Sequence, residues 1–207
     1  MALSTPAGVV VLGGGSFGTA MGAALAQQKK GLEVVLLVRD RALCDDINTL
    51  HCNTRYLKDF LLPSNMRATT SAAEAIRGAQ YAVHAVPVQS SRAFLTGIKD
   101  LLPPSVPIIC VSKGLEVGTG LMMSELVPSA LERKQPAVFL SGPSFAKEVM
   151  EQRPTGVVAA CKDGHLARTV QALLASQVAE GVATAGVVVS LARKLYRPTF
   201  SRSINQS

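Results

Sequence analysis

The sequence predicts an α/β protein built on a doubly wound parallel sheet, and three observations support this fold class. Apolar runs rich in β-branched residues alternate with stretches of helical length. The runs are continuously apolar, which is typical of parallel strands covered by helices on both faces. Hydrophobic residues make up 48% of the 207 residues and charged residues 17%, so the chain can bury a sizeable core. We expect one domain over residues 1–176.

Six apolar runs are the expected strands. They cover residues 8–12, 32–38, 81–86, 107–112, 137–141 and 155–161. Ser71 and Glu74 have the spacing of a capping box, which predicts a short helix before the third run. Apolar residues at helical spacing predict another helix over 163–176.

The segment after the predicted domain has a different pattern. Val178, Val182, Ala185 and Val189 fall on one helical face, so a helix is expected over residues 177–195 where the earlier order would place a strand. Residues 196–207 are polar, basic and aperiodic, which predicts a disordered tail.

Charge and composition exclude several function classes. The net charge of +7 is concentrated at the C-terminal end, which has no acidic residue after Glu180. Because the chain has no Trp and only 4% aromatic residues, no base-stacking surface for nucleic acid is expected. There is no uninterrupted apolar stretch long enough to span a membrane. The N-terminus lacks the basic start of a signal peptide, so a cytoplasmic protein is expected.

The cysteines do not indicate a metal site. The four cysteines, Cys44, Cys52, Cys110 and Cys161, form no C-x-x-C pair, and the three histidines share no ligand spacing with them. Reduced, buried thiols are therefore expected, with neither a disulfide framework nor a metal ion.

A glycine motif follows the first run. Gly13, Gly15 and Gly18 form G-x-G-x-x-G directly after the predicted strand and at the start of a predicted helix. In this context the first glycine permits a tight turn, the second lets backbone approach a pyrophosphate, and the third lets the helix pack closely on the sheet. The motif predicts a dinucleotide-binding, Rossmann-like domain.

The second run ends with Arg39 and Asp40. At this position an acid favours the free 2′-hydroxyl of NAD, whereas an arginine accommodates the 2′-phosphate of NADP. Both residue types are present, so the choice of cofactor stays open. Asp40 fits an exposed ion pair equally well.

Three further positions lie at strand ends or helix starts. His84 lies inside an apolar run and is expected in the core. Lys113 closes the fourth run, where an ammonium can hold a phosphate or polarise a carbonyl, although a surface lysine is the simpler interpretation. Pro143 suits a first helical turn, and Ser144 would add a hydroxyl to the free N–H groups there, making a second anion site.

Taken together, the stretches VVVLGGGSFGTA, HAVPVQ, SKGLE and LSGPSFAKE resemble the NAD-dependent glycerol-3-phosphate dehydrogenases, particularly the plant and algal branch. The similarity runs from about residue 9 to residue 176. It implies a cofactor domain followed by an all-helical domain that supplies most catalytic residues. The implied reaction interconverts dihydroxyacetone phosphate and sn-glycerol 3-phosphate, and complete members are expected to form homodimers.

The resemblance also implies site residues. For the substrate these are Lys113, Gly142 and Ser144. For the cofactor the implied residues are Gly13, Gly14, Gly15, Ser16, Phe17, Gly18, Lys113, Ala146, Val178 and Glu180. Arg39, at the end of the second run, is a further candidate for the cofactor. Ser90 stands where some members carry an aromatic residue after the V-P-x-Q motif.

One part of the family pattern is missing. QVAEGVATAG resembles a segment late in the helical domain, yet it follows ALLAS directly. The intervening part of the family carries a Lys-Asn pair, whose lysine acts as general acid or base, and an Arg-Asn pair that binds the substrate phosphate. Neither dipeptide occurs in this sequence. An internally shortened chain without its own catalytic residue is therefore expected.

Two alternatives remain open. One is a non-catalytic NAD-binding module that pairs with complete subunits. The other is a dehydrogenase of the 6-phosphogluconate or 3-hydroxyacyl-CoA type, against which SKGLE and GPSFAKE argue.

Overall fold

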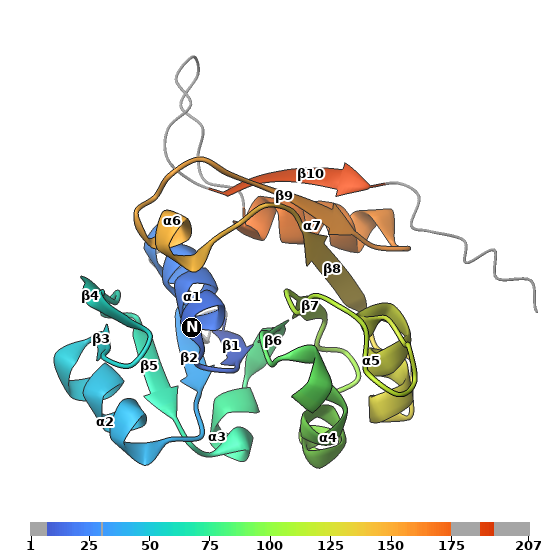
Figure 1. The fold of residues 1–207 in the computed structure, drawn as a ribbon, viewed down its shortest axis with the longest axis horizontal. Helices are drawn as coiled ribbons and strands as arrows, with labels where there is room; N and C mark the ends of the chain where they lie inside the picture. The colour runs from blue at the N-terminus through green and yellow to red at the C-terminus, as the bar shows by residue number, and fades with distance from the viewer. Residues whose placement is uncertain (1–7, 30, 175–186, 193–207) are drawn as a thin grey trace, which may run out of the picture.

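The computed structural model describes residues 8–29, 31–174 and 187–192. Within them, an eight-stranded sheet has the strand order β10-β9-β8-β7-β6-β1-β2-β5, and β3 and β4 form a separate two-stranded sheet (Figure 1). Numbered along the chain, the six strands from β5 to β8 have the order 3-2-1-4-5-6 of a doubly wound dinucleotide-binding sheet. The predicted fold class is confirmed.

The strands of the large sheet are β1 Gly8–Leu12, β2 Glu33–Leu37, β5 Met66–Thr69, β6 Ala79–His84, β7 Ile108–Cys110, β8 Ala137–Ser141, β9 Thr155–Ala160 and β10 Val187–Ala192. The small sheet pairs β3 Cys52–Asn53 with β4 Leu57–Leu61. The helices are α1 Ser16–Gln28, α2 Arg41–Leu50, α3 Ala72–Ile76, α4 Val88–Ile98, α5 Met123–Leu131, α6 Ala146–Met150 and α7 Gly164–Leu174.

Helices cover both faces of the sheet, as the continuous apolar runs predict. Along β1, Val9 and Val11 belong to one core and Val10 and Leu12 to the other. The first core contains side chains from α1, α2, α6 and α7, and the second contains side chains from α3, α4 and α5. Because successive residues of a strand point to opposite faces, only an apolar strand satisfies both cores.

One strand pair departs from the predicted parallel sheet. β8 and β9 are antiparallel, whereas the other pairs of the large sheet are parallel. Residues 142–154 connect the two strands and contain only the five-residue helix α6. A helix that short rises about 7 Å, which is too little to carry the chain back to the start of β8 for a parallel crossover.

The helix predicted over residues 177–195 is wrong for Val187–Ala192, which forms strand β10 parallel to β9. The run VVVSLA satisfies a helical stripe and a strand equally well. The strand is favoured because the edge of β9 can pair with it and α7 provides the crossover of a β-α-β unit. The rest of that predicted helix and the predicted tail lie outside the described residues.

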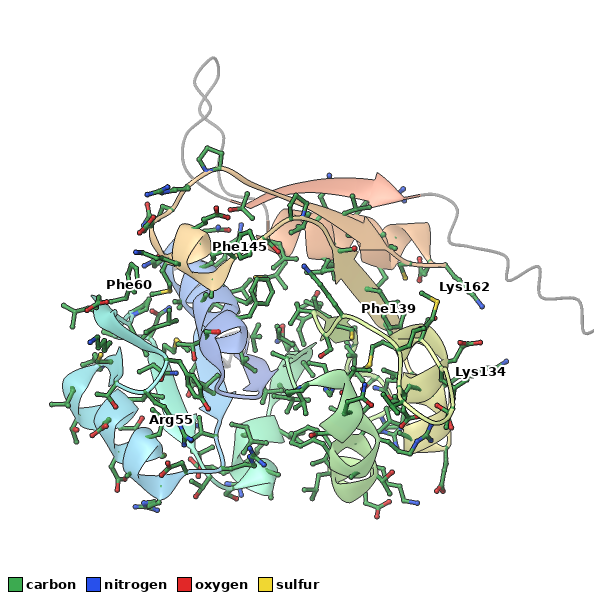
Figure 2. All side chains as sticks on the ribbon, viewed as in Figure 1. Arg55, Phe60, Lys134, Phe139, Phe145 and Lys162 are labelled. Carbon is green, nitrogen blue, oxygen red and sulfur yellow. The ribbon has the colours of Figure 1, made fainter. Side chains whose placement is uncertain are left out.

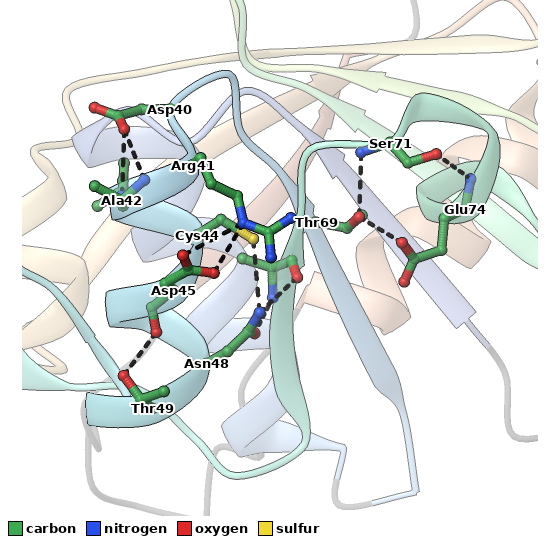
Figure 3. A network of polar contacts seen from close by, with 12 residues as sticks. Asp40, Arg41, Ala42, Cys44, Asp45, Asn48, Thr49, Thr69, Ser71 and Glu74 are labelled. Carbon is green, nitrogen blue, oxygen red and sulfur yellow. Dashed lines mark hydrogen bonds and ion pairs between the residues drawn. The ribbon is translucent and has the colours of Figure 1, made fainter.

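The capping box is half formed. Ser71 Oγ accepts a hydrogen bond from the backbone N–H of Glu74 at 3.3 Å and caps α3. The Glu74 carboxylate does not accept from the backbone N–H of Ser71, as a complete capping box requires. It accepts instead from Thr69 Oγ1 at 2.6 Å (Figure 3). It also pairs with Arg67.

All four cysteines are free, with Cys44 and Cys110 buried and Cys52 and Cys161 half-buried. Burial raises the pKa of the Cys110 thiol to about 12. No group of three metal-ligating side chains occurs among the described residues. In the same part of the chain, none of the helices is both long and apolar enough to cross a membrane.

Candidate nucleotide and substrate site

The glycine turn joins β1 to α1, and three of its glycines are required by close packing. Gly13 has a φ of +115°, and a Cβ there would lie 2.9 Å from the carbonyl oxygen of Ala85. A Cβ on Gly18 would collide with the carbonyl oxygen of Gly13, and one on Gly14 with the Val38 side chain. Side chains at these positions would therefore push the helix or the turn away from the sheet.

Gly15 differs from its neighbours because the protein itself leaves room for a side chain there. A Cβ built on Gly15 has no atom within 4 Å, and the φ of −72° is one that any residue adopts. The open space lies at the start of a 13-residue helix, beside the free N–H groups contributed by residues such as Ser16 and Phe17. These N–H groups suit an anion, so the turn fits the pyrophosphate of a dinucleotide.

A buried asparagine supports the turn from a distant segment. Asn53 is fully buried, and its Nδ2 donates to the Gly14 carbonyl at 3.1 Å and to Thr19 Oγ1 at 2.7 Å. Its Oδ1 accepts from the backbone N–H of Tyr56 at 3.1 Å. Asn53 thereby ties the β3–β4 hairpin to the glycine turn.

A second group of predicted residues meets beside Phe17. Lys113 Nζ donates to the Gly142 carbonyl at 2.7 Å and lies 5.8 Å from the centre of the Phe17 ring. A small pocket here is lined by Phe17, Met21, Val111, Lys113, Leu140, Ser141, Ser144 and Val157. Residues predicted from three separate motifs therefore line one pocket.

Ser144 lies in this pocket with an unused hydroxyl. Its Oγ is buried and has no hydrogen-bond partner among the described residues. A buried hydroxyl without a partner costs free energy unless a ligand or water satisfies it. The Ser144 hydroxyl therefore fits a polar ligand in the pocket.

The helix start predicted at Pro143 and Ser144 is wrong. α6 begins at Ala146, and its N-cap residue Phe145 is extended and 68% exposed (Figure 2). Gly142 has a φ of +146°, and its carbonyl is held by Lys113. This glycine turns the chain away from helical geometry, so Pro143 and Ser144 belong to a loop rather than to a first helical turn.

At the end of β2, Asp40 has two structural roles. Its Oδ1 caps α2 by accepting from the backbone N–H groups of Ala42 at 2.9 Å and Leu43 at 3.4 Å (Figure 3). Its Oδ2 lies 3.4 Å from Arg55 Nη1. The interpretation of Asp40 as an ion-pair partner is confirmed. Arg39 is exposed and has no ion-pair partner within the described residues.

His84 is a core residue, as predicted. It is fully buried, and its Nε2 lies 2.9 Å from Ser91 Oγ. Burial lowers its pKa to about 4, so the ring is neutral at neutral pH. His84 is not among the residues that line the pocket.

Comparison with known proteins identifies the family. The model of the NAD-dependent glycerol-3-phosphate dehydrogenase N-terminus matches residues 8–167. The chain belongs to this family. It is 55% identical over 169 residues to the chloroplastic NAD(+) glycerol-3-phosphate dehydrogenase 2 of Arabidopsis thaliana, covering 81% of this chain and 40% of that protein. The NAD(P)+ enzyme of Streptomyces griseus is 41% identical, covering 82% of this chain and 50% of that one.

A solved structure of a family member has the same fold. Glycerol-3-phosphate dehydrogenase from Coxiella burnetii matches with a TM-score of 0.79 and 27% identity, over 90% of this chain and 54% of that one. The chain thus spans about half or less of the length of these relatives. The predicted family and its NAD cofactor are confirmed, and relatives named for NAD(P)+ occur beside those named for NAD(+).

The structure places the remaining predicted residues as follows. Ala146 is the first residue of α6, and Ser90 is an exposed residue of α4. Val178 and Glu180 lie outside the described residues. Asn53 was not predicted as a site residue, because an asparagine in a short polar stretch gives no signal of a contact with residues more than thirty positions away.

Proposed function

We propose that this chain binds NAD(H) and serves as the cofactor-binding part of a glycerol-3-phosphate dehydrogenase. The observation that carries the proposal is the contrast within the glycine turn. Gly13, Gly14 and Gly18 are required by the packing of the protein itself, whereas the space beside Gly15 is open. A glycine that the fold does not need fits a backbone that a ligand must approach.

Different groups among the described residues would contact the cofactor and the substrate. The N–H groups at the start of α1 would hold the pyrophosphate. The bound cofactor supplies or accepts the hydride that interconverts dihydroxyacetone phosphate and sn-glycerol 3-phosphate. Lys113 uses one of its three N–H donors on Gly142, which leaves donors for a substrate phosphate or carbonyl oxygen. The Ser144 hydroxyl is a further partner.

We also propose that the chain by itself does not turn over substrate. The family resemblance assigns proton transfer to the lysine of a Lys-Asn pair and phosphate binding to an Arg-Asn pair, and the sequence contains neither. A positioned general acid or base contributes about 10²–10⁴-fold to rate, so its loss alone would bring turnover close to background. Cytoplasmic location and homodimer formation stay predictions, and the plant relatives carry chloroplastic names.

Both parts of the proposal can be tested on one sample. Purified chain is mixed with NADH, and binding is followed by the change in nicotinamide fluorescence. Dihydroxyacetone phosphate is then added at saturation, and NADH absorbance is followed over time. We expect a fluorescence change and no absorbance loss above background.

Lys113→Ala serves as the matched control for turnover. Absence of any fluorescence change in the wild type would show that the chain does not bind the cofactor. Steady NADH oxidation that disappears in Lys113→Ala would show that the described domain carries its own proton donor.

A further inference from the structure

The loop that follows Lys113 is held on helix α4 by polar side chains. It connects the end of β7 to the start of α5. Leu115 and Val117 on this loop are 53% and 81% exposed, so the packing of these two side chains contributes little to its position. The contacts that fix the loop come instead from two residues of α4, Gln89 and Arg92.

Gln89 bridges two backbone groups of the loop. Its Nε2 donates to the Leu115 carbonyl at 2.9 Å, and its Oε1 accepts from the backbone N–H of Val117 at 2.8 Å. The side-chain amide thus uses both a donor and the acceptor on the same short segment. Because Gln89 is the second residue of α4, these bonds fix the loop to the start of that helix.

An ion pair holds the loop residue between these two. Glu116 is 8% exposed, and its carboxylate accepts from Arg92 Nε at 2.8 Å and from Arg92 Nη2 at 2.7 Å. Such a two-point contact between guanidinium and carboxylate fixes orientation as well as distance. Arg92 Nη1 also donates to Ser129 Oγ in α5 at 3.0 Å. Since Arg92 lies three positions after Gln89, both side chains project from one face of α4 and hold three consecutive loop residues.

Lys113 lies between this anchored segment and the end of β7. The residue before it, Ser112, donates through Oγ to the Val86 carbonyl at 2.6 Å. A lysine ammonium ends a flexible four-carbon stem, so it keeps one position only if its backbone is fixed and a donor is engaged. Nζ of Lys113 is engaged at the Gly142 carbonyl, and the backbone is fixed by Ser112 on one side and by the α4 contacts on the other.

We propose that Gln89 and the Arg92–Glu116 pair are positioning residues, which hold the Lys113 ammonium at the Gly142 carbonyl and leave its other donors free for the substrate. None of the three is among the described residues that line the pocket, so they act through Lys113. The inference rests on the proposed substrate role of Lys113 and adds the side chains on which that role depends.

The first measurement needs no ligand. The full chain is treated with a limiting amount of an amine-acetylating reagent, and modification of Lys113 is compared with that of the exposed Lys147 by mass spectrometry. An amine engaged at a carbonyl cannot attack the reagent, so release of the loop should raise the ratio of Lys113 to Lys147 modification. We expect a rise of about threefold to tenfold in Gln89→Ala and in Arg92→Ala, which is the loss that hydrogen bonds of ordinary strength predict. Arg92→Lys should reverse part of it.

The second measurement is calorimetric. In Gln89→Ala the dissociation constant for sn-glycerol 3-phosphate should rise by about threefold or more, while the melting temperature stays that of the wild type because Gln89 is exposed. Arg92→Ala leaves the Glu116 carboxylate without its cation and should also lower the melting temperature, so Gln89→Ala is the decisive variant.

Lys99→Ala is the matched control. It removes an ion pair of 2.9 Å between the C-terminal end of α4 and Glu132, which lies outside the loop, so the Lys113 to Lys147 ratio should not change. An unchanged ratio in Gln89→Ala, or an equal rise at both lysines, would overturn the inference. A raised ratio with no heat from sn-glycerol 3-phosphate in the wild type would support the positioning and overturn the substrate role of Lys113 in the proposed function.

Discussion

Replacement of His84 by glutamine should remove a defined part of the pH dependence of folding stability. His84 ends β6 directly before the strand connection to α4, and its Nε2 lies 2.9 Å from Ser91 Oγ in that helix. Its Nδ1 has no partner within the described residues. Burial lowers the pKa of His84 from 6.5 to about 4, so the folded protein resists protonation of the ring.

The size of the effect follows from this shift. Between pH 6.5 and pH 4 the unfolded chain binds a proton at His84 that the folded chain does not. The free energy of unfolding therefore has its full value above pH 6.5 and falls as the pH is lowered through this window. Each pH unit is worth about 1.4 kcal/mol, which gives about 3 kcal/mol over the whole window.

The assay is urea denaturation of the wild type and His84→Gln at neutral pH and at about pH 4.5. Glutamine does not titrate and can still bond Ser91, and carboxylates contribute equally to both proteins. The free energy difference between wild type and variant should shift by about 2–3 kcal/mol towards the variant at the lower pH. An identical pH dependence in the two proteins would refute the assignment of His84 as a buried neutral ring.

Three other changes give distinct expectations. Gly18→Ala should lower the free energy of unfolding by about 1–3 kcal/mol, measured by urea denaturation, because the new methyl collides with the Gly13 carbonyl. Hydrogen bonds from Arg92 and Thr119 lower the pKa of Glu116 to about 2. Stability from this carboxylate is present above pH 4.5 and lost towards pH 2, so acid titration of Glu116→Gln should lack that loss. Lys113→Ala should abolish calorimetric heat on adding sn-glycerol 3-phosphate, and unchanged heat would contradict a substrate role for Lys113.

The parts of the fold that depend on local sequence could be predicted. The glycine turn has its signal within a few residues, because Gly13, Gly14 and Gly18 avoid clashes with neighbouring protein atoms and Gly15 leaves the backbone open to a ligand. The strands β1, β2 and β6 to β9 were predicted from apolar runs. Both faces of β1 and β2 are buried, whereas Gly156 and Val158 on one face of β9 are exposed. Lys113 and Ser144 line one pocket because both follow the carboxyl ends of parallel neighbours, β7 and β8.

The parts that depend on tertiary context could not be predicted. The run at Val187–Ala192 fits a helix or a strand, and the open edge of β9 decides between them. The start of α6 is delayed by the positive φ of Gly142 and by its bond to Lys113, a residue far away in the chain. Asn53 acts across a sequence separation that no local pattern records.

The most direct test of the account is a calorimetric titration of NADH into the wild type and Gly15→Val. The valine enters space that the folded protein leaves empty. The melting temperature of Gly15→Val should therefore match that of the wild type, while the heat of NADH binding disappears. Gly97→Ala, a change on α4 that also meets no atom within 4 Å, is the matched control and should bind as the wild type does. Equal heats for wild type and Gly15→Val, with both proteins folded, would contradict the claim that the glycine turn holds the dinucleotide.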